Sequence, residues 1–236
     1  MENLYFAGRN ISMTHTAMSS IRVMATCALL GEAVGKAAAV ATQNALTPHG
    51  VYLARMTEVQ EKLMNEDCFL PRMTRPISDV CRHATLTGAP DSIRDGRDRP
   101  HALYGTENGE GTLHAPLGSE ITYRFDAQTV SAVHLVFDSD LDRETLPGSE
   151  CERKHSTRAN RRLDSPVMHM PKTLVRAFTL LGERNGKREV LLHVEDNRRR
   201  AYHVPVSGSY DALVLIPTAM WDDTAPTAPI ISFDFA

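Results

Sequence analysis

Several polar residues near the start of the chain have the types and spacing of a binding site for an anionic or electron-rich group. Arg9, Asn10 and Ser12 are followed by His15 and then by Arg22. A long apolar segment begins directly after Arg22. The start of a helix offers free N–H groups and a partial positive charge, which attract such a ligand. The pattern therefore predicts a site at the start of this segment.

A short strand and a long helix must position these residues. The apolar residues 4–6 predict a strand that ends at Gly8, because glycine lets the backbone turn sharply. Ser19 and Ser20 are both good N-caps. The helix is therefore predicted to begin between Ser19 and Arg22.

The same helix is predicted to end near Gln43, because Pro48 and Gly50 then stop it. It consists mostly of Ala, Val, Leu, Met and Gly. A glycine inside a helix costs up to about 1 kcal/mol relative to alanine, so Gly31 and Gly35 indicate close packing against another backbone. We expect this helix to be buried.

Four motifs follow one another in this region with ordered spacing. They are GRNIS at 8–12, His15, RVMATC at 22–27 and GEAVGKAA at 31–38. Together they resemble the C-terminal flavin-binding segment of a family of FAD-dependent oxidoreductases, and the resemblance spans roughly residues 2–72. In that family the helix points its N-terminus at the pyrimidine edge of the flavin. Negative charge develops there on reduction, and a positive helix end stabilises it.

The resemblance implies FAD as the cofactor and assigns particular residues to it. The implied flavin contacts are Arg9, Asn10, Ser12, Arg22, Val23 and Met24. His15 becomes the best candidate for acid–base catalysis or substrate contact, and a hydrogen-bonding role within the loop is an equal alternative.

One part of such an enzyme is missing from the sequence. No GxGxxG turn, which binds the ADP half of FAD, occurs in it. In the family, several hundred residues precede the segment. The resemblance therefore implies the C-terminal portion of a larger oxidoreductase, with a missing N-terminal dinucleotide-binding region as partner and a small-molecule substrate. The isolated chain is expected to bind FAD weakly or not at all and to be inactive.

Residues 57–70 predict a modest amphipathic helix, and Pro71 and Pro76 mark the end of the first unit. From about Ser78, short alternating segments separated by turn residues replace the helical pattern. These segments are 80–86, 111–114, 120–125, 132–137, 174–182, 188–195, 200–206, 212–218 and 230–235. They predict an all-β sandwich, with a hairpin turn at Asn185-Gly186. The expected class is α+β, with domains at residues 1–76 and 77–236.

The second unit resembles the discoidin-like or galactose-binding-like jelly-roll sandwich. The matching segments are SIRDG at 92–96, ITYRF at 121–125, VHLVFD at 133–138, DNRR at 196–199, and Trp221. The resemblance implies loops that bind sugar through aromatic side chains. Few aromatic residues lie in the candidate loops, namely Tyr104, Tyr210 and Trp221. A structural or docking role is therefore preferred over sugar binding. The alternative function is a carbohydrate- or protein-binding sandwich that carries a non-functional flavoenzyme remnant.

Composition and charge exclude several other classes. The 236 residues carry a net charge of −3, and the basic loop between 138 and 162 is mixed with acidic residues, so no nucleic-acid partner is predicted. Glu32 and Lys36 interrupt the longest apolar run, so no membrane partner is predicted. The four cysteines show no CxxC or zinc-ligand spacing, so no metal site and no disulfide framework is expected.

Overall fold

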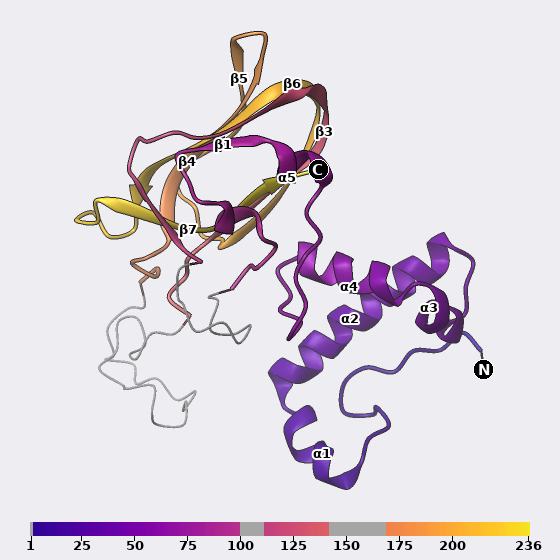
Figure 1. Cartoon of the computed structure of the whole chain (residues 1–236). Helices are drawn as coiled ribbons and strands as arrows, with labels where there is room; N and C mark the ends of the chain where they lie inside the picture. Colours follow the sequence, from indigo (N-terminus) through magenta and orange to yellow (C-terminus); the bar gives the residue numbers. More distant parts are fainter. Residues whose placement is uncertain (1, 100–110, 142–168) are drawn as a thin grey trace, which may run out of the picture. The chain divides into compact units, whose positions relative to one another are not determined.

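The computed structural model describes residues 2–99, 111–141 and 169–236. The chain divides into two compact units, Met1–Leu70 and Pro71–Ala236. The first is helical and the second is built on a large antiparallel sheet (Figure 1), so the α+β class is confirmed. The predicted domains, 1–76 and 77–236, place their boundary six residues later and stay a prediction.

Four helices make up the first unit. They are α1 (His15–Ile21), α2 (Met24–Gln43), α3 (Pro48–Ala54) and α4 (Met56–Asn65). Their core is a small cluster of Val40, Ala41, Val51, Val59 and Leu63. The amphipathic helix predicted at 57–70 is present as α4, which buries Val59 and Leu63.

The start of the long helix differs from the prediction. The Thr14 side chain accepts a hydrogen bond from the N–H of Ala17 and caps a separate helix, α1. Ser19 and Ser20 lie inside α1, where their hydroxyl groups donate to carbonyls three residues earlier. The start predicted from these two serines is therefore wrong. The end predicted at Gln43 is confirmed.

Pro48 follows the end of α2, as predicted, and also begins α3, because proline suits the first helical position. The side chain of Thr47 accepts the N–H of Gly50 at 3.1 Å and so caps α3.

The strand predicted at residues 4–6 is wrong, because these residues form no strand. A strand needs a neighbour to pair its backbone groups, and none pairs with this segment among the described residues.

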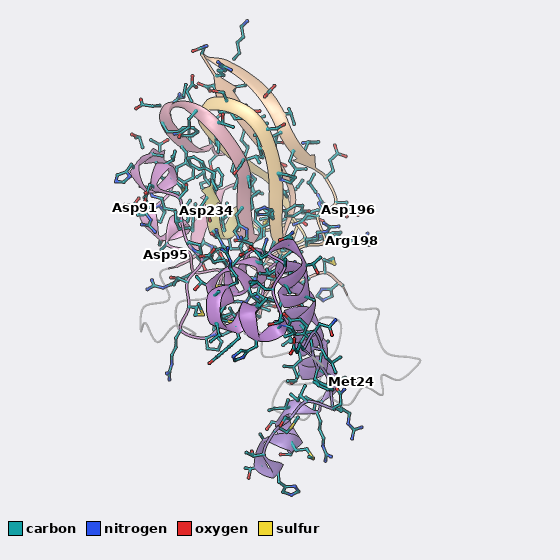
Figure 2. The ribbon with its side chains drawn as sticks, turned by 90° about the vertical axis from the view of Figure 1, so that its right-hand side faces the viewer. Met24, Asp91, Asp95, Asp196, Arg198 and Asp234 are labelled. Atoms are coloured by element: carbon teal, nitrogen blue, oxygen red, sulfur yellow. The ribbon has the colours of Figure 1, made fainter. Side chains whose placement is uncertain are left out.

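Helix α2 is largely exposed, which contradicts the expectation of a buried helix. Among its residues only Val40 and Ala41 are buried. Met24, labelled in Figure 2, is 90% exposed. A Cβ added at Gly31 or Gly35 would meet no atom within 4 Å, so neither glycine is in close packing here.

The length and composition of α2 also suit a membrane-crossing helix. Its mean hydropathy is 1.3 over a window of which 11% is buried. Core helices of soluble proteins satisfy the same criterion. Lys36, one of the two charged residues in the middle of α2, forms an ion pair of 3.0 Å with Glu66, which directly follows α4. This charge is therefore paired within the first unit.

The second unit contains seven described strands. They are β1 (Thr85–Thr87), β2 (Leu113–Pro116), β3 (Ile121–Phe137), β4 (Val175–Arg184), β5 (Lys187–Val194), β6 (Ala201–Met220) and β7 (Thr227–Phe235). The strand order is β2-β7-β3-β6-β4-β5, with β1 also paired to β3, and all pairs are antiparallel. Two short helices, α5 (Asp79–His83) and the 3₁₀ helix η1 (Asp91–Arg94), precede β2.

This sheet folds over itself into two layers. The long strands β3 and β6 curve (Figure 1), and register shifts interrupt their pairing between Arg124 and Gln128. The first part of β3 pairs with β1, whereas its last part pairs with β7. Tyr123, in the first part, nevertheless contacts the ring of Phe233 on β7 at 4.9 Å and donates a hydrogen bond of 2.7 Å to its carbonyl. The two parts of β3 therefore face each other across a shared core, as in a β-sandwich.

Most predicted strands are present. In two cases, a pair of successive predicted strands forms one continuous strand. Segments 120–125 and 132–137 are parts of β3, and 200–206 and 212–218 are parts of β6. The hairpin at Asn185-Gly186 is confirmed, with positive φ values of 50° and 74°. The strand predicted from residue 80 is wrong at its start. There the Ser78 side chain accepts the N–H of Cys81 and caps α5.

Gly182 provides the first prediction. A Cβ added there would lie 2.5 Å from the ring of Tyr210, so Gly182→Ala overpacks the core. We expect it to lower the free energy of unfolding of the second unit by about 1–3 kcal/mol. Urea unfolding followed by the fluorescence of Trp221, the single tryptophan of the chain, measures this change. Gly31→Ala is the control, because its Cβ meets nothing, and equal stability of the two variants would contradict the prediction.

Backbone exchange in α2 provides the second prediction. Since only its last two turns bury side chains, its first half should open at low free-energy cost. Hydrogen–deuterium exchange should find residues 24–36 less protected than β3 and β6. Equal protection in a verified monomer would contradict this.

Candidate functional site

The six residues assigned to flavin contact, and His15, are all exposed. Arg9, Asn10 and Ser12 lie in the loop before α1, and His15 is the first residue of that helix. The other three, Arg22, Val23 and Met24, lie where α1 ends and α2 begins. All seven side chains are therefore free to meet a ligand.

Helix α1 separates these residues into two groups. His15 and Arg22 stand at its two ends, and seven residues at 1.5 Å each place them about 10 Å apart along the axis. The structure therefore brings Arg22, Val23 and Met24 together at the start of α2. It does not bring His15 to the same point.

The start of α2 has the features of an anion site. Its N-cap is Val23, whose side chain has no acceptor, so no side chain caps the first N–H groups of the helix. The Arg22 side chain, next to this start, is exposed and carries a positive charge. Twenty residues of helix follow, long enough for a full positive end. The helix start at which the site was predicted lies two residues beyond the predicted range, and the site itself stays a prediction.

Sequence reasoning missed a buried polar cluster in the second unit. The Arg75 guanidinium donates from Nε to Asp98 at 3.1 Å and from Nη1 to Asp234 at 2.8 Å. Its Nη2 also contacts Asp234 and donates to the hydroxyl of Ser232 at 3.3 Å. Arg75, Asp98 and Asp234 are all buried, so the cluster ties residues 75–98 to β7, on which Figure 2 labels Asp234.

The pKa of Asp98 reflects this environment. Burial raises the pKa of this carboxyl group, but His134 and Arg75 outweigh burial and hold it well below its ordinary value. Glycine at position 96 allows the backbone of this segment to pass close to the backbone of Arg75. Its φ is 78°, and an added Cβ would lie 2.2 Å from the carbonyl oxygen of Arg75.

Part of the cluster is visible in the sequence of β7. Ser232 and Asp234 alternate with Phe233 and Phe235, and such alternation is typical of a strand with one face in solvent. In the structure both faces of β7 are buried, because Arg75 covers the polar one.

Two of the three aromatic residues considered for sugar binding make hydrogen bonds within the second unit. Tyr210 is buried, and its hydroxyl donates to Glu189 at 2.6 Å, which raises the pKa of Tyr210 to about 12. Trp221 is half-buried, and its Nε1 donates to the carbonyl of Asn197 at 2.7 Å. Tyr104 lies outside the described residues.

Within residues 2–99, 111–141 and 169–236, no group of three His, Cys, Asp or Glu residues able to hold a metal occurs. Cys27, Cys68 and Cys81 are free thiols, and Cys151 lies outside the described residues. Burial raises the pKa of Cys81 to about 11, so this thiol is a packing residue.

The third prediction tests the buried cluster. Arg75→Met should lower the free energy of unfolding of the second unit by about 3–5 kcal/mol, because it leaves two buried carboxylates without their partner. Trp221 fluorescence during urea unfolding measures this. The matched control is Arg82→Met, which removes an exposed ion pair of 3.8 Å to Asp79 and should cost about 0–1 kcal/mol. A loss at Arg75 no larger than at Arg82 would contradict the assignment.

Known proteins resemble the two units separately. Residues 1–63 match the family described as FAD dependent oxidoreductase. A comparison with curated proteins gives no match.

Several solved carbohydrate-binding modules resemble part of the chain. A GH31 CBM32-2 module bound to GalNAc is 11% identical, with 65% of this chain and 96% of that one covered and a TM-score of 0.45. The family 32 module of Streptococcus pneumoniae EndoD is 10% identical, with 67% and 99% covered and a TM-score of 0.43. The module of C. perfringens NanJ in complex with galactose is 10% identical, with 64% and 90% covered and a TM-score of 0.38.

The sandwich itself is established by its strand register and by the contacts of Tyr123 across the core. The family resemblance of the first unit is confirmed by the match over residues 1–63. The chain thus joins a segment similar to the FAD dependent oxidoreductases to an antiparallel β-sandwich.

Proposed function

We propose that this chain forms the C-terminal part of an FAD-dependent oxidoreductase and supplies the last helix of its flavin site. The observation that carries the proposal is the match over residues 1–63 together with the uncapped start of α2 beside Arg22. A dinucleotide-binding region outside this sequence supplies the site for the ADP half. The substrate is a small molecule.

The residues present fit the part of FAD assigned to them. The free N–H groups at the start of α2 and the exposed Arg22 donate to an electron-rich edge. Arg9, Asn10 and Ser12 offer further donors from the preceding loop. No GxGxxG turn is present for the pyrophosphate, so the described residues fit the flavin ring and leave the other half unbound.

In this proposal the chain's own residues supply binding and charge. FAD, when bound, takes up or gives the electrons of the reaction. The start of α2 and Arg22 would favour the negative charge of the reduced form, and Val23 and Met24 would belong to the residues that hold this part of FAD. His15, at the other end of α1, is assigned to acid–base catalysis or substrate contact, with a hydrogen-bonding role within the loop as the equal alternative.

The exposed apolar surface of the first unit supports the proposal that a further region of the protein packs against it. Among the large hydrophobic side chains exposed in the described residues, only Leu141 and Val190 lie in the second unit, and all the others lie between residues 4 and 56. Exposed apolar patches of this kind mark interfaces. We assign this surface, including Leu29 of α2, to packing against the dinucleotide-binding region.

The alternative, that the sandwich binds carbohydrate or protein and the first unit is a remnant, stays a hypothesis. Tyr210 is buried and the indole N–H of Trp221 is occupied, so neither is a ready platform for a sugar. Flavin content distinguishes the two hypotheses, because only the first requires it.

The fourth prediction tests the proposed function. The protein extended through its upstream coding sequence should be yellow, with the visible spectrum of bound flavin. In that protein Arg22→Ala should lower the flavin reduction potential, because a charge-assisted hydrogen bond to the reduced form is lost. Such a bond is worth roughly 1.5–3 kcal/mol, and part of that should appear in a redox titration.

The matched control is Arg55→Ala, since Arg55 is exposed and lies between α3 and α4, away from the assigned residues. Its potential should equal that of the parent. A colourless extended protein would refute the proposed function. An unchanged potential in Arg22→Ala with FAD fully bound would refute only the role of Arg22. Residues 1–236 alone should not bind FAD stoichiometrically at sub-micromolar concentration in calorimetry.

A further inference from the structure

An exposed turn of two residues, Asn185-Gly186, joins strands β4 and β5. Arg184 and Lys187 lie directly opposite each other in the register, so only these two residues connect the strands. Both have positive φ values, 50° and 74°, which is the conformation of a type I′ turn. The hairpin protrudes from the sandwich (Figure 1), and both turn residues are exposed. Water therefore reaches the turn freely.

The side-chain amide of an asparagine that precedes a glycine is chemically labile. The backbone nitrogen of Gly186 can attack Cγ of Asn185 and form a five-membered succinimide ring. The bond from Cγ to the amide nitrogen breaks, and that nitrogen leaves as ammonia after it takes up, through solvent, the proton that the Gly186 nitrogen has lost. Water then opens the ring at either carbonyl carbon and leaves aspartate or isoaspartate. A Cβ added at Gly186 would meet no atom within 4 Å, so the space around the attacking residue is open.

The turn holds Asn185 close to the geometry that ring closure needs. Its φ of 50° is near the value of about +60° that the first central residue has in both type I′ and type II′ turns. The ψ of that residue is about +30° in type I′ and about −120° in type II′. At the second value the Gly186 nitrogen lies on the same side of the Cα–C bond as Cβ, so the ring can close. Only the peptide group between the two residues must rotate, and glycine accepts either conformation.

The contacts of Asn185 hold its backbone and leave its side chain free. Its N–H donates to Oδ2 of Asp211 at 2.7 Å, which restrains φ. Within the described ranges its side-chain amide makes no hydrogen bond. By contrast, the amide groups of Asn44 and Asn197 donate to backbone carbonyls at 2.9 Å and 2.7 Å. These two asparagines must first lose a hydrogen bond before they can react.

We propose that Asn185 is a site of spontaneous deamidation and isomerisation in the folded protein, and that the β4–β5 hairpin registers the change. Aspartate at this position keeps the turn and adds a carboxylate between the directly opposed cations Arg184 and Lys187. Isoaspartate instead adds a methylene group to the main chain, so the connection no longer fits the two-residue register. The pairing of Glu183 with Arg188, next to the turn, is then disturbed. This site is separate from the flavin site.

The fifth prediction is read directly from the unmodified chain. During incubation of the folded protein at neutral pH, Asn185 should convert at least about tenfold faster than Asn44 and Asn197, which must each break a hydrogen bond. A protease that cleaves after glutamate releases residues 184–189 for mass spectrometry, because Glu183 and Glu189 flank the turn. An isoaspartyl methyltransferase, used as a probe, measures the isoaspartate. Equal retention of the amide at all three positions overturns the proposal.

Two variants test the effect on the hairpin. Hydrogen–deuterium exchange in β5 should rise in the aged parent, whereas Asn185→Asp, which adds the charge without the methylene group, should keep its protection. Equal protection of β5 in the aged parent and in Asn185→Asp overturns the role of the hairpin.

Asn185→Gln controls for ageing elsewhere, such as at the second Asn-Gly pair, 108–109, which lies outside the described residues. A glutamine would need a six-membered ring, which closes far more slowly, so this variant should keep β5 protected after the same incubation. A loss of protection in Asn185→Gln equal to that in the aged parent overturns the assignment to Asn185.

Discussion

The contact between Arg75 and Asp234 is the interaction on which the second unit depends most. It joins two residues 159 positions apart, at the first and last segments of the unit. Strand β7 is central, since it pairs with both β2 and β3. Its apolar face meets Tyr123 in the core, and its polar face would be open without Arg75. The guanidinium therefore lets a strand of alternating character be buried on both sides.

The sequence predicted the fold where local chemistry and burial agree. The alternation in 120–125 and 132–137 and the turn at Asn185-Gly186 are local signals, and the structure confirms them. That these two segments form one continuous strand could not be predicted, because the polar residues between them resemble a turn. The helix at 79–83 was also missed, because five residues are too few to show a helical pattern in the sequence. The side chain of Ser78 caps this helix in the structure.

The candidate site was predicted through residue types, and its geometry was not. Ser19 and Ser20 have the properties of caps, but Thr14 begins a helix earlier and leaves them inside it. The consequence is a long helix whose start is capped by a valine. The buried cluster was missed because Arg75 lies in an irregular segment, and no periodic pattern links it to a strand at the other end of the unit.

Tyr210 and its two glycines constrain how this sandwich can change over generations. A Cβ at Gly182 or at Gly208 would overlap the ring or the hydroxyl of Tyr210, at 2.5 Å and 2.3 Å. A larger residue at either glycine becomes tolerable only after Tyr210 has become smaller, so the effects of the substitutions are not additive. The order of the steps therefore matters. Among related chains the three positions should vary together, and glycine at 182 and 208 should accompany an aromatic residue at 210.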